Sequence, residues 1–289
     1  MQSLVGKRLR IWGVSYGLIG DLIMGLPCLT YFEKKYPGSY KIWVIENKVK
    51  VCADIFKGHP LIDEVYITKA QGGEPFNGKD LAYAKSCDVT TTLGKWKHSK
   101  SNWYDEIDVV EETAYMAGVH DLTTVLTEEE MVPKLYKWFK VNKNPKTISI
   151  WGYAGRYNNL RSPSEKWWDT TVDYLIKNGY TIYDFGMSTQ PKIYKKNHPK
   201  VISYRHLSFM EQVKLSLNAD VSIGVETGAS WVMAAYEHNT ITLMTNWWRN
   251  HTANLLSLAP IGKNTVNLFG KDSCDSITKE QLLKTIKQF

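Results

Sequence analysis

Cysteine is scarce in this chain of 289 residues, and its four cysteines stand far apart: Cys28, Cys52, Cys87 and Cys274. None forms a C-x-x-C pair, and the 7 histidines show no spacing typical of metal ligands. We therefore expect no disulfide framework, no metal and no cofactor. Scattered, unpaired thiols are typical of a reducing compartment, which favours a cytoplasmic location.

Long apolar runs and several well-known catalytic motifs are also missing. No stretch approaches the roughly 18 apolar residues of a membrane-spanning helix, so we expect no transmembrane segment, while peripheral membrane contact stays open. There is no G-x-x-x-x-G-K-[ST] phosphate loop, which disfavours P-loop enzymes. The absence of G-x-G-x-x-G disfavours an NAD enzyme.

The composition that remains is that of a globular protein with an excess of positive charge. Hydrophobic residues make up 43% of the chain and charged residues 22%, with 36 Lys and Arg against 29 Asp and Glu, a net charge of +7. This balance favours an anionic ligand or surface, such as a phosphate, a nucleic acid or an acidic glycolipid.

Hydrophobic periodicity predicts strands that alternate with helices. The first unit reads as a strand at Arg8–Val14, a glycine-bearing turn, a helix at Leu22–Tyr36 and a strand at Tyr40–Ile45. Pro27 should kink this helix or delay its start. The predicted fold is therefore α/β, with parallel sheets covered by helices on both faces.

The same alternation returns after the polar, proline-bearing segment Val141–Lys146, which predicts two Rossmann-like halves, residues 1–143 and 144–289. The elements expected in the second half are strands and helices in turn: Thr147–Trp151, Glu165–Lys177, Tyr180–Phe185, Ser208–Asn218, Asp220–Gly224, Ala229–His238 and Thr240–Met244.

Three loops follow the carboxyl ends of predicted strands, where open parallel sheets bind ligands. In the first, Gly17, Gly20 and Asp21 form G-x-x-G-D at a turn from strand to helix. The glycines allow close backbone approach to an oxyanion, and the carboxylate of Asp21 could act as a general base. Alternatively, Asp21 is simply the N-cap of the helix.

The second and third loops offer cations and hydroxyl-binding groups. Arg156 and Arg161 precede a helix, where two guanidiniums suit a diphosphate, although solvated loop arginines are an equal alternative. Glu226, Thr227 and Gly228 precede another helix and could hold sugar or ribose hydroxyls. Otherwise Thr227 is a helix cap and Glu226 a first-turn acid that complements the helix dipole.

Together these loops resemble a known family. Gly17-Leu18-Ile19-Gly20-Asp21 with Pro27, the stretch His59–Val65, and Ala219–Gly228 with the tail that follows resemble, in order and separation, motifs of the heptosyltransferases, glycosyltransferase family nine. The family usually has Asp where this chain has Glu226 and His where it has Trp231.

The resemblance implies a GT-B fold: two Rossmann-like domains facing across a cleft, with the acceptor mostly in the N-terminal domain and the nucleotide-sugar mostly in the C-terminal domain. It implies metal-independent, inverting transfer from a nucleoside-diphosphate sugar to a hydroxyl of a saccharide or glycolipid. Asp21 matches the catalytic base. Gly17, Gly20, Arg156, Arg161 and the segment 226–228 match donor-binding positions.

Two other functions stay open. Aromatic and basic tracts at Trp96–His98, Trp103-Tyr104 and Trp247–Arg249, with the net charge of +7, would suit a glycosyltransferase acting on modified DNA bases. The replacement at Trp231 would suit a non-catalytic module that binds a nucleotide or a sugar.

Overall fold

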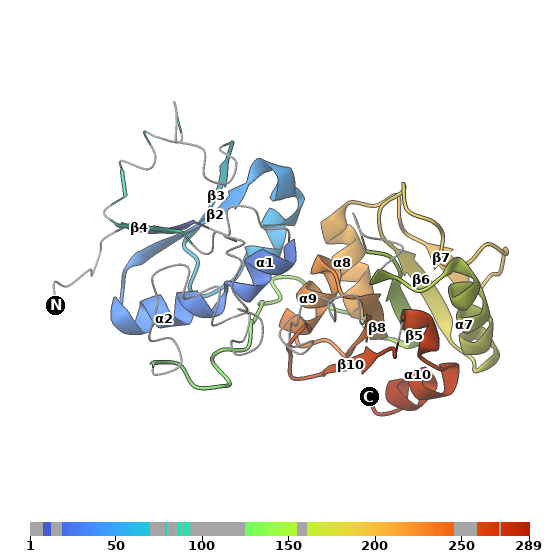
Figure 1. The fold of residues 1–289 in the computed structure, drawn as a ribbon. Helices are drawn as coiled ribbons and strands as arrows, with labels where there is room; N and C mark the ends of the chain where they lie inside the picture. The colour runs from blue at the N-terminus through green and yellow to red at the C-terminus, as the bar shows by residue number, and fades with distance from the viewer. Residues whose placement is uncertain are drawn as a thin grey trace, which may run out of the picture. The chain divides into compact units, whose positions relative to one another are not determined.

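Two separate sheets of parallel strands form the framework of the computed structural model (Figure 1). The chain divides into two units, Met1–Trp138 and Phe139–Phe289. The structure describes residues 8–12, 19–69, 79, 82, 86, 87, 89–92, 125–154, 161–245, 259–271 and 273–289. Every strand pair in these ranges is parallel, so the predicted α/β class with parallel sheets is confirmed.

The sheet of unit 1 has four strands in the order β3-β2-β1-β4. Their bounds are β1 Arg8–Trp12, β2 Tyr40–Glu46, β3 Glu64–Thr68 and β4 Val89–Thr92. All residues of β2 after Tyr40 are buried, because β2 lies between two neighbours and is covered on its faces. From β1 the chain adds β2 and β3 on one side and β4 on the other. The carboxyl end of β1 therefore lies at the switch point of the strand order, where open sheets bind ligands.

The predicted helix Leu22–Tyr36 is wrong as one continuous element. The structure has α1 at Ile19–Met24 and α2 at Pro27–Lys35, with Pro27 in the first turn of α2. Proline lacks a backbone N–H and fixes its own φ angle, so it suits the first position of a helix and interrupts a longer one. The segment Asn47–Phe56 follows β2 as 3-10 helix η1, and the Phe56 ring packs 5.9 Å from Trp43.

The sheet of unit 2 has six strands in the order β10-β9-β8-β5-β6-β7. In chain order they are β5 Asn144–Trp151, β6 Thr181–Phe185, β7 Val201–Ser203, β8 Ala219–Val225, β9 Thr240–Met244 and β10 Thr265–Phe269. The neighbours β5 and β8 pair up to Trp151 and Gly224. Their carboxyl ends therefore lie side by side at one edge of the sheet.

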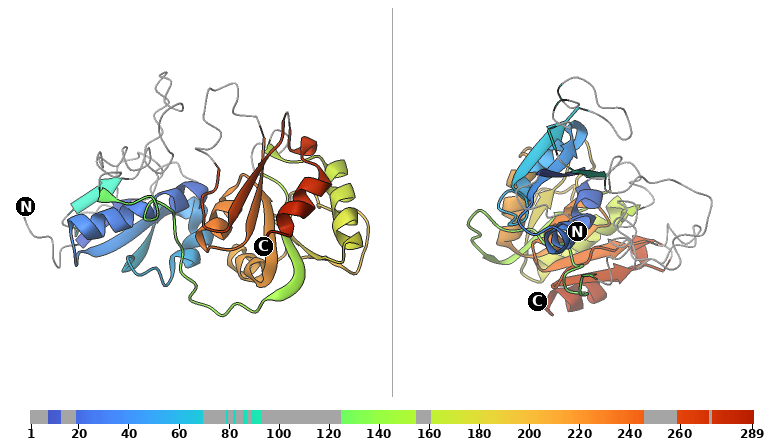
Figure 2. Two further views of the ribbon diagram at one scale, coloured as in Figure 1. Left: turned by 90° about the horizontal axis from the view of Figure 1, so that it is seen from below. Right: turned by 90° about the vertical axis from the view of Figure 1, so that its left-hand side faces the viewer.

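Helices cover both faces of this second sheet, as predicted. They are α7 Glu165–Lys177, α8 Phe209–Asn218, α9 Gly228–Ala235 and α10 Lys279–Ile286. Ile148 and Ile150 of β5 pack in one core with α7 and α10, whereas the intervening Ser149 meets Ser216 of α8. Figure 2 shows α7 and α10 on the same side of this sheet.

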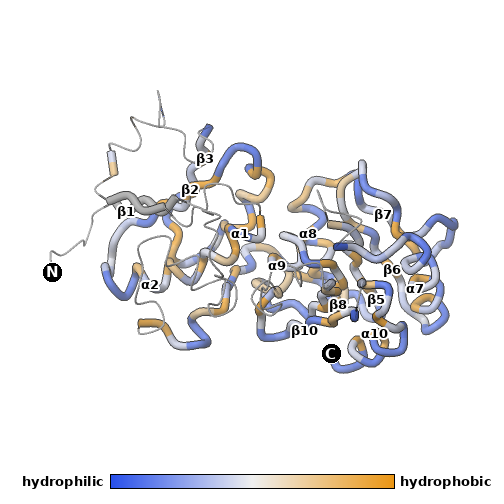
Figure 3. The backbone as a smooth tube through the Cα atoms, in the orientation of Figure 1, coloured by the Kyte–Doolittle hydropathy of each residue, from blue (hydrophilic) through white to orange (hydrophobic). Residues whose placement is uncertain are grey.

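The helices are amphipathic in the way that this two-faced burial requires. Along α7 and α10, apolar and polar stretches alternate, so that one side of each helix meets the core (Figure 3). Hydroxyl side chains begin both helices: Ser164 accepts from the backbone N–H of Trp167, and Thr278 accepts from that of Gln281. None of the helices in the described ranges is long and apolar enough to cross a membrane.

Candidate functional site

A guanidinium and a carboxylate from two different loops meet at the carboxyl edge of the unit 2 sheet. Arg161 follows β5 and Glu226 follows β8, and their side chains form an ion pair. The same guanidinium donates a 2.6 Å hydrogen bond to the backbone carbonyl of Glu226. Both side chains are partly accessible, at 18% and 16% exposure. The pairing places two of the predicted donor-binding residues in one site, although they are 65 positions apart.

Thr227 lies next to this pair with its hydroxyl buried. It occupies the N-cap position of α9 with an extended backbone, but its side chain makes no capping hydrogen bond. Its oxygen has no hydrogen-bond partner among the described residues. A buried hydroxyl without a partner costs free energy. Thr227 is thus the helix cap by position, as the alternative interpretation has it, but its side chain does not cap, and Glu226 precedes the helix and is no first-turn acid. A ligand that accepts or donates a hydrogen bond would satisfy the Thr227 hydroxyl.

Gly228 begins α9, and a second glycine lets this helix approach the sheet closely. A Cβ atom at Gly224 would lie 2.3 Å from the Ser230 hydroxyl, which hydrogen-bonds the Val225 carbonyl at 2.6 Å. Trp231, in the next turn, is 2% exposed and belongs to the core. The start of α9, where the first backbone N–H groups have no partner within the helix, is thus fixed against the end of β8 beside Thr227.

Asp21 lies in the first turn of α1, not at its N-cap. The helix begins at Ile19, so Asp21 is its third residue, and the helix-cap interpretation is wrong. Its side chain is half-buried, while Gly20 is buried. Because α1 follows β1, Asp21 belongs to the carboxyl edge of the unit 1 sheet.

Some predicted residues lie outside the described ranges. These are Gly17 of the first loop and Arg156 of the second, together with the aromatic and basic tracts at 96–98, 103–104 and 247–249. Of the second loop, only Arg161 enters the geometry above. In the ranges that the structure covers, no group of three or more His, Cys, Asp or Glu side chains is arranged to hold a metal ion.

A second arginine–carboxylate pair in unit 2 was missed by the sequence reasoning. Arg205 donates from Nε and Nη2 to the two oxygens of Asp184, both at 2.7 Å, and from Nη1 to the Gln190 carbonyl at 2.9 Å. The side chains are only 7% and 3% exposed. Burial raises the pKa of the Asp184 carboxyl, and the Arg205 guanidinium counteracts this rise. Nothing in the local sequence marks these residues as partners.

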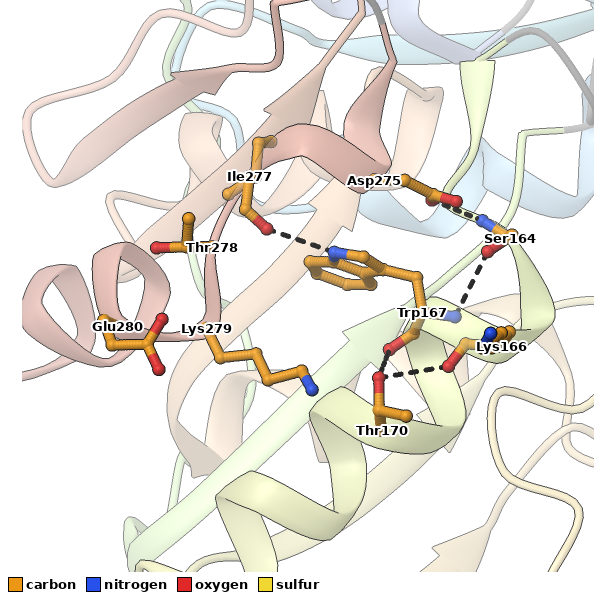
Figure 4. Close-up of a pocket in the computed structure, with 9 residues that line it drawn as sticks. All are labelled: Ser164, Lys166, Trp167, Thr170, Asp275, Ile277, Thr278, Lys279 and Glu280. Carbon is orange, nitrogen blue, oxygen red and sulfur yellow. Dashed lines mark hydrogen bonds between the residues drawn. The ribbon is translucent and has the colours of Figure 1, made fainter.

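A hollow of about 520 Å³ opens where the start of α7 meets the segment before α10 (Figure 4). Its polar groups are mostly paired with one another: Asp275 accepts from the Ser164 backbone, and the Trp167 indole donates to the Ile277 carbonyl at 3.1 Å. None of the predicted site residues lines it. We assign it no ligand.

Comparison with known proteins gives a result only at the level of structure. No protein-family model and no curated protein matches the sequence. Heptosyltransferase II from E. coli has a TM-score of 0.66 and 13% identity, over 97% of this chain and 98% of its own. A family 9 glycosyltransferase from Veillonella parvula has a TM-score of 0.64 and 14% identity, over 99% and 98% of the two chains. This chain has the GT-B fold.

A third similar structure, E. coli heptosyltransferase WaaC with ADP, has a TM-score of 0.59 and 13% identity, over 97% of this chain and 99% of its own. The likeness to heptosyltransferases therefore extends over nearly the whole length of each chain. The fold expected from the three sequence motifs is confirmed. In this GT-B chain, Asp21 of the first motif and Glu226 of the third lie at the carboxyl edges of the two sheets, whereas Glu64 of the second motif begins β3 at the opposite edge.

Proposed function

We propose that this GT-B protein is an inverting, metal-independent glycosyltransferase that moves a sugar from a nucleoside-diphosphate sugar to a hydroxyl acceptor. The observation that carries the proposal is the group formed by Arg161, Glu226 and the buried hydroxyl of Thr227 at the carboxyl ends of β5 and β8. A diphosphate bonded to a sugar needs cationic groups for its phosphates, and hydroxyl and carboxylate groups for the hydroxyls of the sugar. The full-length likeness to heptosyltransferases supports the same reaction class.

Unit 2 would bind the donor. The Arg161 guanidinium can fork onto oxygens of the diphosphate, joined by Arg156, and backbone N–H groups at the start of α9 can contact the same charge. Glu226 would orient Arg161 and accept hydrogen bonds from hydroxyls of the donor. When the donor bond breaks, these cationic groups stabilise the negative charge that develops on the leaving diphosphate, which is the task that a metal ion performs in other enzymes.

Unit 1 would bind the acceptor and supply the base. The Asp21 carboxylate takes the proton of an acceptor hydroxyl. At the same time, the oxygen of that hydroxyl forms a bond to the anomeric carbon of the donor. The bond from that carbon to the diphosphate oxygen breaks, and its electron pair leaves with the diphosphate. Attack on the face opposite the leaving group inverts the configuration at the anomeric carbon.

Donor binding can be tested by thermal unfolding in the presence of ADP, UDP, GDP and CDP and their sugars. ADP is the first choice, because the similar WaaC structure contains it. A ligand that binds only the folded state stabilises it by about 2.7 kcal/mol at 100 times its dissociation constant. The nucleotide that raises the melting temperature most identifies the donor. If no diphosphate and no nucleotide-sugar raises it, the proposal is wrong.

Replacing Asp21 tests the base. Asp21→Ala should lower the transfer rate by about 10² to 10⁴-fold, because general base catalysis contributes that much. Nucleotide binding should be nearly unchanged, since unit 2 holds the donor groups. Asp54→Asn, at a partly exposed carboxylate of η1 in the same unit, serves as the control. Transfer by Asp21→Ala at a near wild-type rate would leave Asp21 as a structural residue only.

A further inference from the structure

A carboxylate that the sequence motifs do not include is buried at the end of β2. Glu46 is the last residue of this strand and is 4% exposed. Residues of a strand alternate between its faces, so Glu46 lies on the same face as Ile42 and Val44, which form a small apolar cluster in unit 1. A charged residue at such a position loses its hydration and has to be compensated by other groups.

The described residues compensate this buried carboxylate only in part. The Lys48 ammonium, on a side chain 39% exposed, lies 2.8 Å from Glu46 Oε2 and balances its charge. Neither carboxylate oxygen accepts a hydrogen bond from any residue in the described part of the chain. Glu46 precedes η1 but does not cap it. By contrast, the equally buried Asp184 accepts from Arg205 and Ser203. Within the described residues, Glu46 therefore has a balancing positive charge but no well-aligned hydrogen-bond donor.

The position of Glu46 relates it to Asp21 within unit 1. In the parallel register, Trp12 of β1 pairs with Val44, and Glu46 lies two residues farther towards the carboxyl edge. The chain leaves β1 at this edge and enters α1, which carries Asp21 in its first turn. Neighbouring strands are about 4.8 Å apart. Glu46 and Asp21 thus belong to the same edge of the same sheet. Glu46 ends β2, and Asp21 lies in the helix that follows the neighbouring strand β1.

We propose that Glu46 binds hydroxyl groups of a saccharide acceptor, an inference that rests on the proposed glycosyltransferase function. An ionised carboxylate only accepts hydrogen bonds, and its two oxygens suit two neighbouring hydroxyls of one sugar ring. A metal ion or an amine would add positive charge beside Lys48, whereas a neutral sugar supplies donors and leaves the charge balanced. Glu46 would hold the acceptor ring while Asp21 takes the proton of the reacting hydroxyl.

The variant Glu46→Gln tests this role, because it keeps the size of the side chain and replaces one acceptor oxygen by a donor. The probes are methyl glycosides of glucose, galactose, mannose and a heptose, titrated into the full chain and followed by saturation-transfer NMR. At least one should bind the wild type, and Glu46→Gln should weaken that binding tenfold or more. The matched control is Glu64→Gln. Glu64 is the first residue of β3 and therefore lies where the strands of this sheet begin, whereas Glu46 lies where they end.

Stability and donor binding separate a binding role from a structural one. Loss of a carboxylate that lacks donors should leave the melting temperature of the ligand-free Glu46→Gln variant unchanged or higher. A lower melting temperature with unchanged glycoside binding would show that Glu46 only pairs with Lys48, and would overturn the inference. The inference is also overturned if no glycoside binds the wild type.

The nucleotide experiment distinguishes this failure from failure of the proposed function. The stabilisation by ADP, or by the best nucleotide of the panel, should be equal in Glu46→Gln and the wild type. If a nucleotide-sugar binds and is consumed but Glu46→Gln binds glycosides normally, only the acceptor inference fails. If no nucleotide binds while a glycoside binds through Glu46, the transferase proposal fails and the saccharide site remains.

Discussion

Two arginine–carboxylate pairs in the described part of unit 2 have the same chemistry but different settings. Arg205 and Asp184 are almost fully buried and joined by two parallel hydrogen bonds, and Arg205 Nη1 also donates to a backbone carbonyl. Arg161 and Glu226 are partly accessible and lie beside the buried hydroxyl of Thr227, which has no hydrogen-bond partner in the part of the chain that the structure describes. The first pair joins β6 to the segment that follows β7, whereas the second lies at the end of the sheet where ligands bind.

The comparison shows that the burial and the hydrogen-bond partners of an ion pair indicate whether it stabilises the fold or binds a ligand. A pair with all its hydrogen bonds made inside the protein has nothing left to offer a ligand, and its removal should affect stability. A pair at a strand end, with solvent access and an unsatisfied neighbour, is placed to exchange partners when a ligand arrives. Variants of the two pairs should therefore fail in different assays.

The largest expected effect is on stability, in Arg205→Met. Removing the guanidinium leaves the buried Asp184 carboxylate without its partner, which should lower the free energy of unfolding by about 3–5 kcal/mol. Urea unfolding measures this change. The double variant Arg205→Met with Asp184→Leu should recover most of the loss, because no buried charge remains. Below its melting temperature, Arg205→Met should still be stabilised by the donor nucleotide.

The next effect is on activity, in Arg161→Gln. Loss of one preorganised group that stabilises developing charge should lower the transfer rate by about 10² to 10³-fold. The melting temperature of the free protein should change little, because the pair is partly accessible to water. Arg161→Lys keeps the charge without the fork and should recover only part of the rate. A large loss of stability with normal activity would make this pair equivalent to Arg205 and Asp184.

A buried histidine extends the comparison of buried ionisable groups to unit 1. His59 Nδ1 accepts from the Leu61 backbone at 3.1 Å, and its ring packs 5.0 Å from Tyr136. Burial lowers the pKa of His59 from 6.5 to about 4. Between these values the unfolded chain binds a proton that the folded chain does not bind. The free energy of unfolding should therefore fall as the pH drops from 6.5 to 4.

At about pH 4.5, this linkage corresponds to about 2–3 kcal/mol relative to neutral pH. Urea unfolding at both pH values measures it. His59→Asn, which offers an amide oxygen near the position of Nδ1, should remove most of the His59 contribution to the pH dependence. An equal pH dependence in both proteins would show that other groups cause it.

The smallest effect is expected in Thr227→Val. Valine has the shape of threonine without its hydroxyl, which is buried and has no partner among the described residues. The ligand-free variant should therefore be as stable as the wild type or more stable, by up to about 1 kcal/mol. Affinity for the donor nucleotide should fall about tenfold, the equivalent of one hydrogen bond to a charged group. Calorimetric titration with the nucleotide measures the second change. Unchanged affinity would remove Thr227 from the donor site.

Much of the fold could be predicted because local signals agree with it. Ser164 before the helix and Asn178-Gly179 after it mark the ends of α7, and its predicted bounds match the structure. The short strand β7, with three residues, and the last elements β10 and α10 were not predicted. A strand of three residues has too little periodicity to stand out from loops. Its existence depends on pairing with β6.

The part of the candidate site that could be predicted consists of residues that follow the carboxyl ends of neighbouring strands, because the topology of a parallel sheet brings these ends together. The rule for parallel sheets brought Arg161 and Glu226 into one site without any local signal linking them. The pair of Arg205 and Asp184 could not be found in this way, since it depends on side-chain packing between β6 and a loop. Glu46 had a weak signal that was not used: it is a charged residue that closes an otherwise apolar run.

The three residues of β7 have a consequence for association between molecules. A strand at the edge of a sheet exposes backbone N–H and C=O groups that can pair with another chain, and long flat edges promote aggregation. Val201–Ser203 is too short to offer more than a few such groups. Because β7 is so short, a strand from a second copy could form only a few backbone hydrogen bonds at this edge of the six-stranded sheet.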